Sequence, residues 1–235
     1  MRDIKAILLV GGLGTRLRSV VSSQPKVLAS IGEKPFVELL VRQLQSQGIH
    51  NLVMCTGYLG DQIESKFKDG RDWHVSIKYS REDSPQGTAG ALRLAQSHLQ
   101  DAPDFLVLNG DSFLEVDFRD LLSFHRHHQN AVATLAVVHV DDAARYGTVQ
   151  VDADSRITAF TEKTSAHAPG MINGGVYVFS PSIWKHIPEG PASLEHDVFP
   201  QLLPQGMFAH QQRGVFIDIG TPADFARAQQ ILRAP

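Results

Sequence analysis

Three glycines close together follow the first apolar run of the chain, residues 4–10: Gly11, Gly12 and Gly14. Glycine has no Cβ, so the backbone N–H groups of such a loop can close around an anionic ligand. Arg16 and Lys26 add positive charge beside the loop. These residue types and this spacing predict a cradle for phosphate groups.

The loop is neither of the two common phosphate-binding loops. Leu17 stands where the pattern G-x-G-x-x-G would need its third glycine, and no G-x-x-x-x-G-K-[ST] occurs in the chain. The missing fingerprint argues against a dinucleotide-dependent oxidoreductase. The glycines alone would also suit an ordinary turn, but the charged neighbours favour phosphate binding.

A carboxylate is expected at the same edge of the fold. Asp111 follows the apolar run 105–108 and so ends a second predicted strand. In open α/β sheets ligands bind beyond the carboxyl ends of the parallel strands, where the loop at 11–16 is also predicted. A nucleotide with a divalent metal fits a carboxylate beside a phosphate cradle.

Four further polar segments each allow two interpretations. Gln86–Ala91 opens a helix and could let a flat ring approach its backbone, or it could be an ordinary helix start. Thr161-Glu162-Lys163 could be only a charged strand end, and Asn173-Gly174-Gly175 only a turn or bulge. Asp218 ends a predicted strand before Thr221 and Pro222, and it could simply stabilise the helix that begins there.

The string Gly11-Gly12-Leu13-Gly14-Thr15-Arg16-Leu17, with Pro25-Lys26 downstream, resembles the signature of the sugar-1-phosphate nucleotidyltransferases. These enzymes make NDP-sugars from an NTP and a sugar 1-phosphate. The resemblance runs from Ile4 to Leu232, and the longer string from Gly14 to Val21 is most similar to the D-glycero-α-D-manno-heptose 1-phosphate guanylyltransferases. Two departures, Val27 in place of a second proline and Phe216 where tryptophan is common, leave every charged group in place.

The resemblance implies a role for each polar segment. The residues implied to contact the nucleotide are Leu9, Gly11, Gly12, Gly14, Thr15, Gln86, Gly87 and Thr88. Those implied to contact the sugar phosphate are Tyr146, Gly147, Glu162, Lys163, Asn173 and Gly174. Asp111 and Asp218 would hold Mg²⁺, and the implied catalytic cations are Arg16, Lys26 and Lys163.

The implied reaction is magnesium-dependent nucleotidyl transfer that releases pyrophosphate. GTP and D-glycero-α-D-manno-heptose 1-phosphate are the expected substrates. Mannose 1-phosphate with GTP is the nearest competitor, and glucose 1-phosphate with UTP or dTTP lies further away. A protein of another class, a catalytically inactive subunit that senses nucleotide sugars, would have the same fold, but the retained charged residues argue for an enzyme.

The elements that must position these residues alternate in the first half of the chain. Strands are predicted at 4–10, 51–56, 75–80 and 104–108, and helices at 35–47, 60–68 and 90–99. Closely spaced strands at 131–140, 147–151, 157–161 and 175–179 predict antiparallel additions to the same sheet, followed by a helix at 222–232.

This order predicts a three-layer α/β/α sandwich around a central mixed, mostly parallel sheet of Rossmann-like type. We expect one domain over 1–235, with a nucleotide-binding half at 1–111 and a sugar-phosphate-binding half at 112–235.

Composition argues against several other classes of protein. With 235 residues, 43% of them hydrophobic, and a net charge of −3, the chain shows no basic surface for nucleic acid. No apolar run reaches the roughly 18 residues that cross a bilayer, and no signal-like segment precedes the first strand, so we expect a cytoplasmic protein without a membrane partner. A homo-oligomer is compatible with these data.

Two groups of potential metal ligands or nucleophiles are not assigned to a site. Cys55 lies in an apolar run and is predicted to be buried and inert. The run His125-Arg126-His127-His128 is interpreted as a solvated helix end, because no nearby carboxylate or cysteine completes a ligand set.

Overall fold

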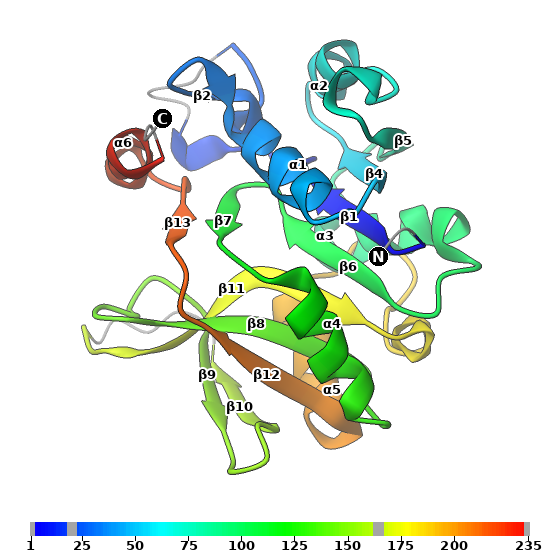
Figure 1. The fold of residues 1–235 in the computed structure, drawn as a ribbon, viewed down its shortest axis with the longest axis vertical. Coiled ribbons are helices and arrows are strands. Elements are labelled where there is room, and N and C mark those ends of the chain that lie inside the picture. The colour runs from blue at the N-terminus through cyan, green and yellow to red at the C-terminus, as the bar shows by residue number, and fades with distance from the viewer. Residues whose placement is uncertain (1–2, 18–22, 162–166, 233–235) are drawn as a thin grey trace.

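The computed structural model describes residues 3–17, 23–161 and 167–232, and a mixed sheet covered by helices on both faces forms its centre (Figure 1). Along one path of hydrogen-bonded neighbours within these ranges the strands are β10 (Ile157–Thr161), β9 (Thr148–Val151), β11 (Gly170–Phe179), β6 (Phe105–Asn109), β1 (Lys5–Leu9), β4 (Asn51–Thr56) and β5 (Ser76–Arg81). Off this path, β8 (Ala133–Val140) pairs with β11, and β12 (Met207–Gln212) pairs with β8.

The parallel part of the sheet is built from the apolar runs that the sequence shows. β1 pairs in parallel with both β4 and β6, and Leu8 lies between Met54 and Leu108. All three side chains are fully buried, as expected for strands that are covered on both faces. β10 and β11 run against the other strands, so the sheet is mixed and mostly parallel, as predicted.

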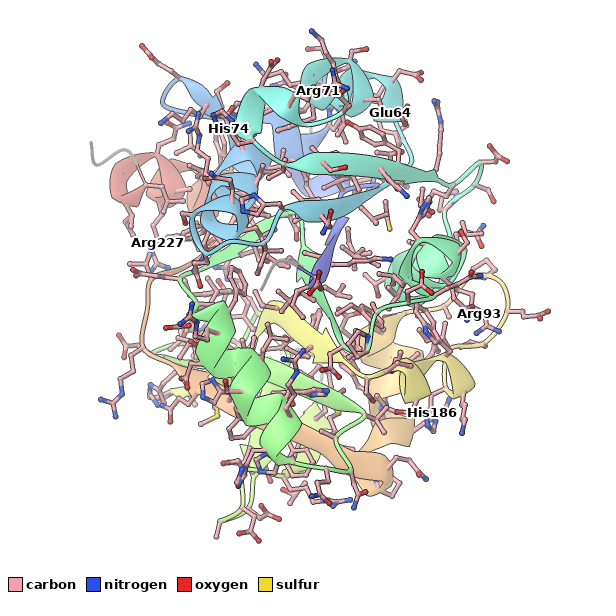
Figure 2. All side chains as sticks on the ribbon, turned by 45° about the vertical axis from the view of Figure 1, so that its right-hand side comes forward. Glu64, Arg71, His74, Arg93, His186 and Arg227 are labelled. Atoms are coloured by element: carbon pink, nitrogen blue, oxygen red, sulfur yellow. The ribbon has the colours of Figure 1, made fainter. Side chains whose placement is uncertain are left out.

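Helices cover the two faces of the sheet with two separate apolar cores. On one face lie α1 (Phe36–Ser46), α2 (Gly60–Phe67) and α4 (Phe118–His127). On the other lie α3 (Gly87–Leu94) and α5 (Phe199–Gly206), together with a 3-10 turn at Pro181–Lys185. The side chain of Arg93 ties α3 to that turn by donating from Nη1 to the carbonyl of Trp184 at 2.9 Å, on the side of the molecule where His186 also lies (Figure 2). The three-layer prediction is confirmed.

Two two-stranded ribbons and a third apolar cluster lie outside the main sheet. β7 (Ser112–Leu114) pairs with β13 (Phe216–Asp218), and β2 (Ser30–Ile31) pairs with β3 (Lys34–Pro35). The last helix, α6 (Pro222–Ile231), packs through Ala228 against Phe36 and Ile219. Thr221 caps α6 with its side chain, and Pro222 occupies its first turn, as predicted.

The second half of the chain differs from expectation in several places. β12 runs parallel to β8, an addition that the prediction of purely antiparallel strands did not include. β11 begins at Gly170 and not at 175, because its register with β8 shifts between Asn173 and Val176 and the strand continues through that bulge. α3 begins at Gly87, three residues before the predicted start.

The histidine-rich end of α4 corrects one prediction. His125 is 3% exposed, and its Nδ1 lies 2.8 Å from the hydroxyl of Thr134. Burial lowers the pKa of His125 to about 4, so the ring is neutral at pH 7. The interpretation as a solvated helix end is therefore wrong for His125, which belongs to the packing of α4 on β8. His127 is exposed, as expected.

Across the described residues, none of the helices has the length and apolar character needed to span a bilayer.

The last residue of α5, Gly206, provides a test of how this helix end packs against the segment at Asn130. Gly206 has φ +111°, and a Cβ placed there would lie 2.1 Å from the carbonyl oxygen of Asn130. Gly190 also has a positive φ, +83°, but nothing lies within 4 Å of its would-be Cβ. Gly206→Ala should lower the free energy of unfolding by at least about 3 kcal/mol, and Gly190→Ala by about 1 kcal/mol. Urea unfolding of both variants measures the difference, and equal losses would show that the steric contact is unimportant.

Candidate active site

Two adjoining cavities open at the carboxyl ends of the parallel strands. The first, of about 290 Å³, is lined by the glycine loop, the end of β6 and the start of α3. The second, of about 530 Å³, is lined mainly by residues beyond 111, from the β8–β9 connection, β11 and the segment before α6. The residues common to both linings are Thr88, Asn109 and Asp111. A ligand in one cavity therefore lies next to a ligand in the other.

Gly11 and Gly14 lie in the tightest parts of the glycine loop. A Cβ at Gly11 would come within 3.1 Å of the Gly57 nitrogen and 3.2 Å of a Glu82 oxygen. Gly14 has φ +59° and lies against the stem of Lys26. Leu9, Gly11 and Gly12 line the first cavity, whereas Thr15 is exposed in a 3-10 turn, Thr15–Leu17. The same turn holds the backbone of Arg16, whose side chain lies outside the described part of the structure.

Lys26 and Asp111 are in direct contact. The ammonium group of Lys26 donates a hydrogen bond to Oδ2 of Asp111, and both side chains are largely shielded from solvent. Lys26 begins a 3-10 turn directly after Pro25, and Asp111 lies just beyond β6, so the contact joins the segment that follows the glycine loop to the end of the sheet. A cation and a carboxylate expected to act on one nucleotide are thereby brought together.

Asp218 lies beside Asp111 at the end of β13. The N–H of Ile219 donates to the carbonyl of Asp111 at 2.9 Å, and the hydroxyl of Ser112 donates to Oδ2 of Asp218 at 3.2 Å. Burial and the neighbouring Asp111 carboxylate raise the pKa of Asp218 to about 6, although the N–H of Gly220 donates to Oδ1 at 2.8 Å.

This donor set fits a magnesium ion. Mg²⁺ takes oxygen ligands and is commonly held by one or two carboxylates together with phosphate oxygens and waters. Within the described ranges, no group of three or more His, Cys, Asp or Glu side chains is arranged for a metal. The pair Asp111 and Asp218 would therefore need phosphate or water oxygens to complete the coordination.

The start of α3 joins the two halves of the chain. Gly87 has φ +70°, and a Cβ there would be 2.4 Å from the carbonyl oxygen of Ala192. The hydroxyl of Thr88 donates to Oε2 of Glu195 at 2.9 Å and accepts from the Leu194 N–H at 2.8 Å. Gly87 and Thr88 line the first cavity.

Glu82 lines the first cavity where Gln86 was expected alongside Gly87 and Thr88. The Gln86 amide group donates to Ser84, and its side chain is absent from the lining of both described cavities. Glu82 lines the first cavity and accepts a hydrogen bond from the Gln86 N–H at 3.1 Å. Burial raises the pKa of Glu82. The sequence signal was weak because Glu82 stands in a charged run, Arg81-Glu82-Asp83, that is typical of a solvated strand end.

The predicted sugar-side residues surround the second cavity. Tyr146, Gly147 and Asn173 line it. Gly174 lies at the bulge of β11, where a Cβ would be 2.5 Å from the side chain of Leu114. Glu162 and Lys163 lie outside the described residues.

A buried hydrogen-bond network lies beneath this cavity. The hydroxyl of fully buried Tyr177 accepts from Nδ2 of Asn173 at 2.9 Å and from Nδ2 of Asn109 at 3.4 Å, and it donates to Oε1 of Glu195 at 3.4 Å. Burial raises the pKa of Tyr177 well above its usual value, so the phenol stays protonated. The buried Oδ1 of Asn109 has no hydrogen-bond partner among the described protein atoms.

Several cavity residues were not singled out by sequence reasoning, among them two charged side chains. Glu82 and Arg145 both contact the site from charged surface segments, where single acidic and basic residues carry little information. Cys55, by contrast, is buried as predicted, and burial raises its thiol pKa to about 12.

The family described as Nucleotidyl transferase matches residues 5–234. Mannose-1-phosphate guanyltransferase beta-B of Xenopus laevis is 37% identical over 226 residues, which cover 94% of this chain and 62% of that protein. The chain thus spans less than two thirds of the length of the curated relatives it matches.

Solved structures show the same fold. HddC from Yersinia pseudotuberculosis, crystallised with GMP-PN, is 30% identical and superposes with a TM-score of 0.86 over 98% of this chain and 100% of the other. A Bacillus anthracis protein crystallised with sucrose is 24% identical, with a TM-score of 0.88 over 99% and 96% of the two chains.

The raised pKa of Asp218 predicts an unusual stability change. Because the folded-state pKa lies above the unfolded value, ionising Asp218 costs stability above pH 4, and the full cost is reached above pH 6. Asp218→Asn should therefore raise the free energy of unfolding by about 1–3 kcal/mol at pH 7.5 without divalent metal. The gain should shrink towards pH 4.

Urea unfolding at pH 7.5 and at pH 4.5 measures this effect, with exposed Asp101→Asn as the control. Equal stability changes at the two pH values would show that ionisation of Asp218 does not destabilise the folded protein.

Proposed function

Since the chain belongs to the nucleotidyl transferase family, we propose that it transfers a nucleotidyl group from an NTP to a sugar 1-phosphate and releases pyrophosphate. The observation that carries this proposal is the position of Asp111, which borders both cavities and contacts Lys26. A nucleotide in the first cavity would present its α-phosphate at that boundary, next to a sugar phosphate in the second.

The chemistry requires alignment more than proton transfer. An oxygen of the sugar 1-phosphate attacks the α-phosphorus, the bond from that phosphorus to the bridging oxygen breaks, and pyrophosphate leaves with the electron pair. The nucleophile is already an anion, so no general base is needed. A bound Mg²⁺ would supply charge neutralisation at the α-phosphate.

This chain's own residues would do the rest. Asp111 and Asp218 would hold the metal, and the ammonium group of Lys26 would bind the nucleotide phosphates. Arg16 would act on the same phosphates, and Lys163 would hold the attacking phosphate.

A guanine base is favoured by the chemistry of Glu82. Guanine presents two adjacent donors, N1–H and the 2-amino group, and an ionised carboxylate accepts two hydrogen bonds side by side. Uracil and thymine present one donor between two acceptors, so a carboxylate would face at least one acceptor. The guanyltransferase relative and the HddC complex with GMP-PN support the same choice.

For the sugar we propose a manno-configured 1-phosphate, with D-glycero-α-D-manno-heptose 1-phosphate first. The support for heptose is the sequence string from Gly14 to Val21. Residues 18–21 of that string lie outside the described part of the structure. Mannose 1-phosphate is a second candidate, because the curated relatives are mannose-1-phosphate guanylyltransferases. The second cavity, of about 530 Å³, lies within the usual size range of small-ligand sites.

An inactive sensing subunit would use the same cavities without turnover. The retention of Arg16, Lys26, Asp111, Lys163 and Asp218 favours the enzyme, since binding alone would not need all five. Multiple-turnover pyrophosphate release separates the two functions.

The first test is a pyrophosphate-release screen of four NTPs against heptose, mannose, glucose and N-acetylglucosamine 1-phosphates with Mg²⁺. We expect the highest kcat/KM with GTP and a manno-configured sugar. Asp111→Asn should lower turnover 10²–10³-fold, because it removes a charge that acts in the transition state. Full activity of this variant would overturn the mechanism, and a preference for UTP or dTTP with glucose 1-phosphate would overturn the substrates.

The second test concerns the base. Glu82→Gln replaces one acceptor by a donor, so the ratio of kcat/KM for GTP over UTP should fall about 10–100-fold. Glu33→Gln, at an exposed turn, is the control and should leave the ratio unchanged. An unchanged ratio in Glu82→Gln would show that the base is recognised elsewhere.

A further inference from the structure

Arg145 connects the β8–β9 loop to the start of α6. Its Nη1 and Nη2 each donate to one carboxylate oxygen of Asp224 at 2.7 Å, which is a bidentate ion pair. Nη2 also lies 3.3 Å from the hydroxyl of Tyr146. Arg145 thus joins a loop that lines the second cavity to a helix that follows Asp218 closely in sequence.

Asp224 is well placed to transmit this contact. It is 7% exposed, and its Oδ2 accepts from the hydroxyl of Thr221 at 2.6 Å. Thr221 in turn accepts from the Asp224 N–H and caps α6. The guanidinium of Arg145 and the Thr221 hydroxyl hold the pKa of Asp224 below its usual value, so the pair is fully ionised at pH 7.

The segment between Asp218 and Thr221 is held close to Asp218 by the Ser112 hydroxyl and the Gly220 N–H, which both donate to its carboxylate. β13 is only three residues long, and its sheet partner among the described strands is β7. α6 packs on a small apolar cluster that includes Ile217 and Ile219, separate from the two main cores. The N–H of Ile219 holds the other end of the segment to Asp111. The Arg145–Asp224 pair adds to these contacts a side-chain link between the loop of the second cavity and the helix that follows the segment.

We propose that Arg145 is a positioning residue which, through Asp224, keeps the Asp218 carboxylate beside Asp111, where the two side chains would hold a divalent metal. This role rests on the proposed function, but metal binding can be measured separately from turnover. Arg145 acts through Asp224 and does not itself need to contact the reacting atoms.

The test compares two ion pairs of similar exposure. In the site pair, the side chains of Arg145 and Asp224 are 50% and 9% exposed. In the control pair on the far end of α4, those of Arg126 and Asp104 are 52% and 14% exposed, with a contact of 2.7 Å. Arg145→Gln and Arg126→Gln therefore remove similar interactions, and only the first should affect the metal site.

The readout is Mn²⁺ binding, followed by electron paramagnetic resonance on the full chain with saturating GTP, since Mn²⁺ shares the oxygen ligands of Mg²⁺. Arg145→Gln should weaken Mn²⁺ binding at least fivefold and raise the half-saturating Mg²⁺ concentration for turnover by a similar factor. GTP binding without metal should change less than twofold. Asp224→Asn should have the same effect, and the double variant should be no worse than either single one.

Unchanged Mn²⁺ affinity in Arg145→Gln, with a loss of melting temperature equal to that of Arg126→Gln, would overturn the proposal by leaving only a structural role. If Arg145→Gln does not fold, Arg145→Lys keeps the charge without the planar fork and allows the same comparison. If the native chain releases no pyrophosphate but Arg145→Gln still weakens Mn²⁺ binding, the proposed function fails and the positioning role stands.

Discussion

The close approach of β1 and β6 at their carboxyl ends determines where the rest of the site lies. The N–H of Gly110 donates to the carbonyl of Leu9 at 2.9 Å, and a Cβ at Gly110 would lie only 2.6 Å from that oxygen. Glycine alone permits this spacing. The glycine loop after β1 and the carboxylate of Asp111 after β6 are consequently neighbours, and the segment of Asp218 is joined to them through the Ile219 N–H.

Much of the first half of the fold could be predicted because its signals are local. Continuous apolar runs become β1, β4 and β6, and their alternation with amphipathic helices leaves few arrangements for a parallel sheet. The position of β12 could not be predicted, since half of its residues are polar and its partner β8 lies far back in the chain. Glu82 was missed for a related reason: its place depends on the register of β5 on β4, which directs its N–H to the carbonyl of Thr56. The distant pairing of Arg145 with Asp224 has no sequence signal at all.

Several polar groups of the site destabilise the folded protein when no ligand is bound. The carboxylates of Asp111 and Asp218 repel each other, Glu82 is partly desolvated, and the Oδ1 of Asn109 is buried without a protein partner. Each of these features costs free energy in the free protein, and each would be relieved by a cation or a ligand with donor groups. Sites that depart from the rules of packing in this way are typical of functional surfaces.

The wall formed by Thr88, Asn109 and Asp111 makes the two cavities energetically dependent on each other. Thr88 contacts Glu195 and Asn109 contacts Tyr177, so a group bound on one side changes the polar surroundings of the other. Thermodynamic reciprocity then applies: the factor by which one bound ligand changes the affinity of the other equals the factor in the opposite direction. The coupling itself therefore favours neither order of ligand addition, and any preferred order depends on the separate affinities and access rates of the two ligands.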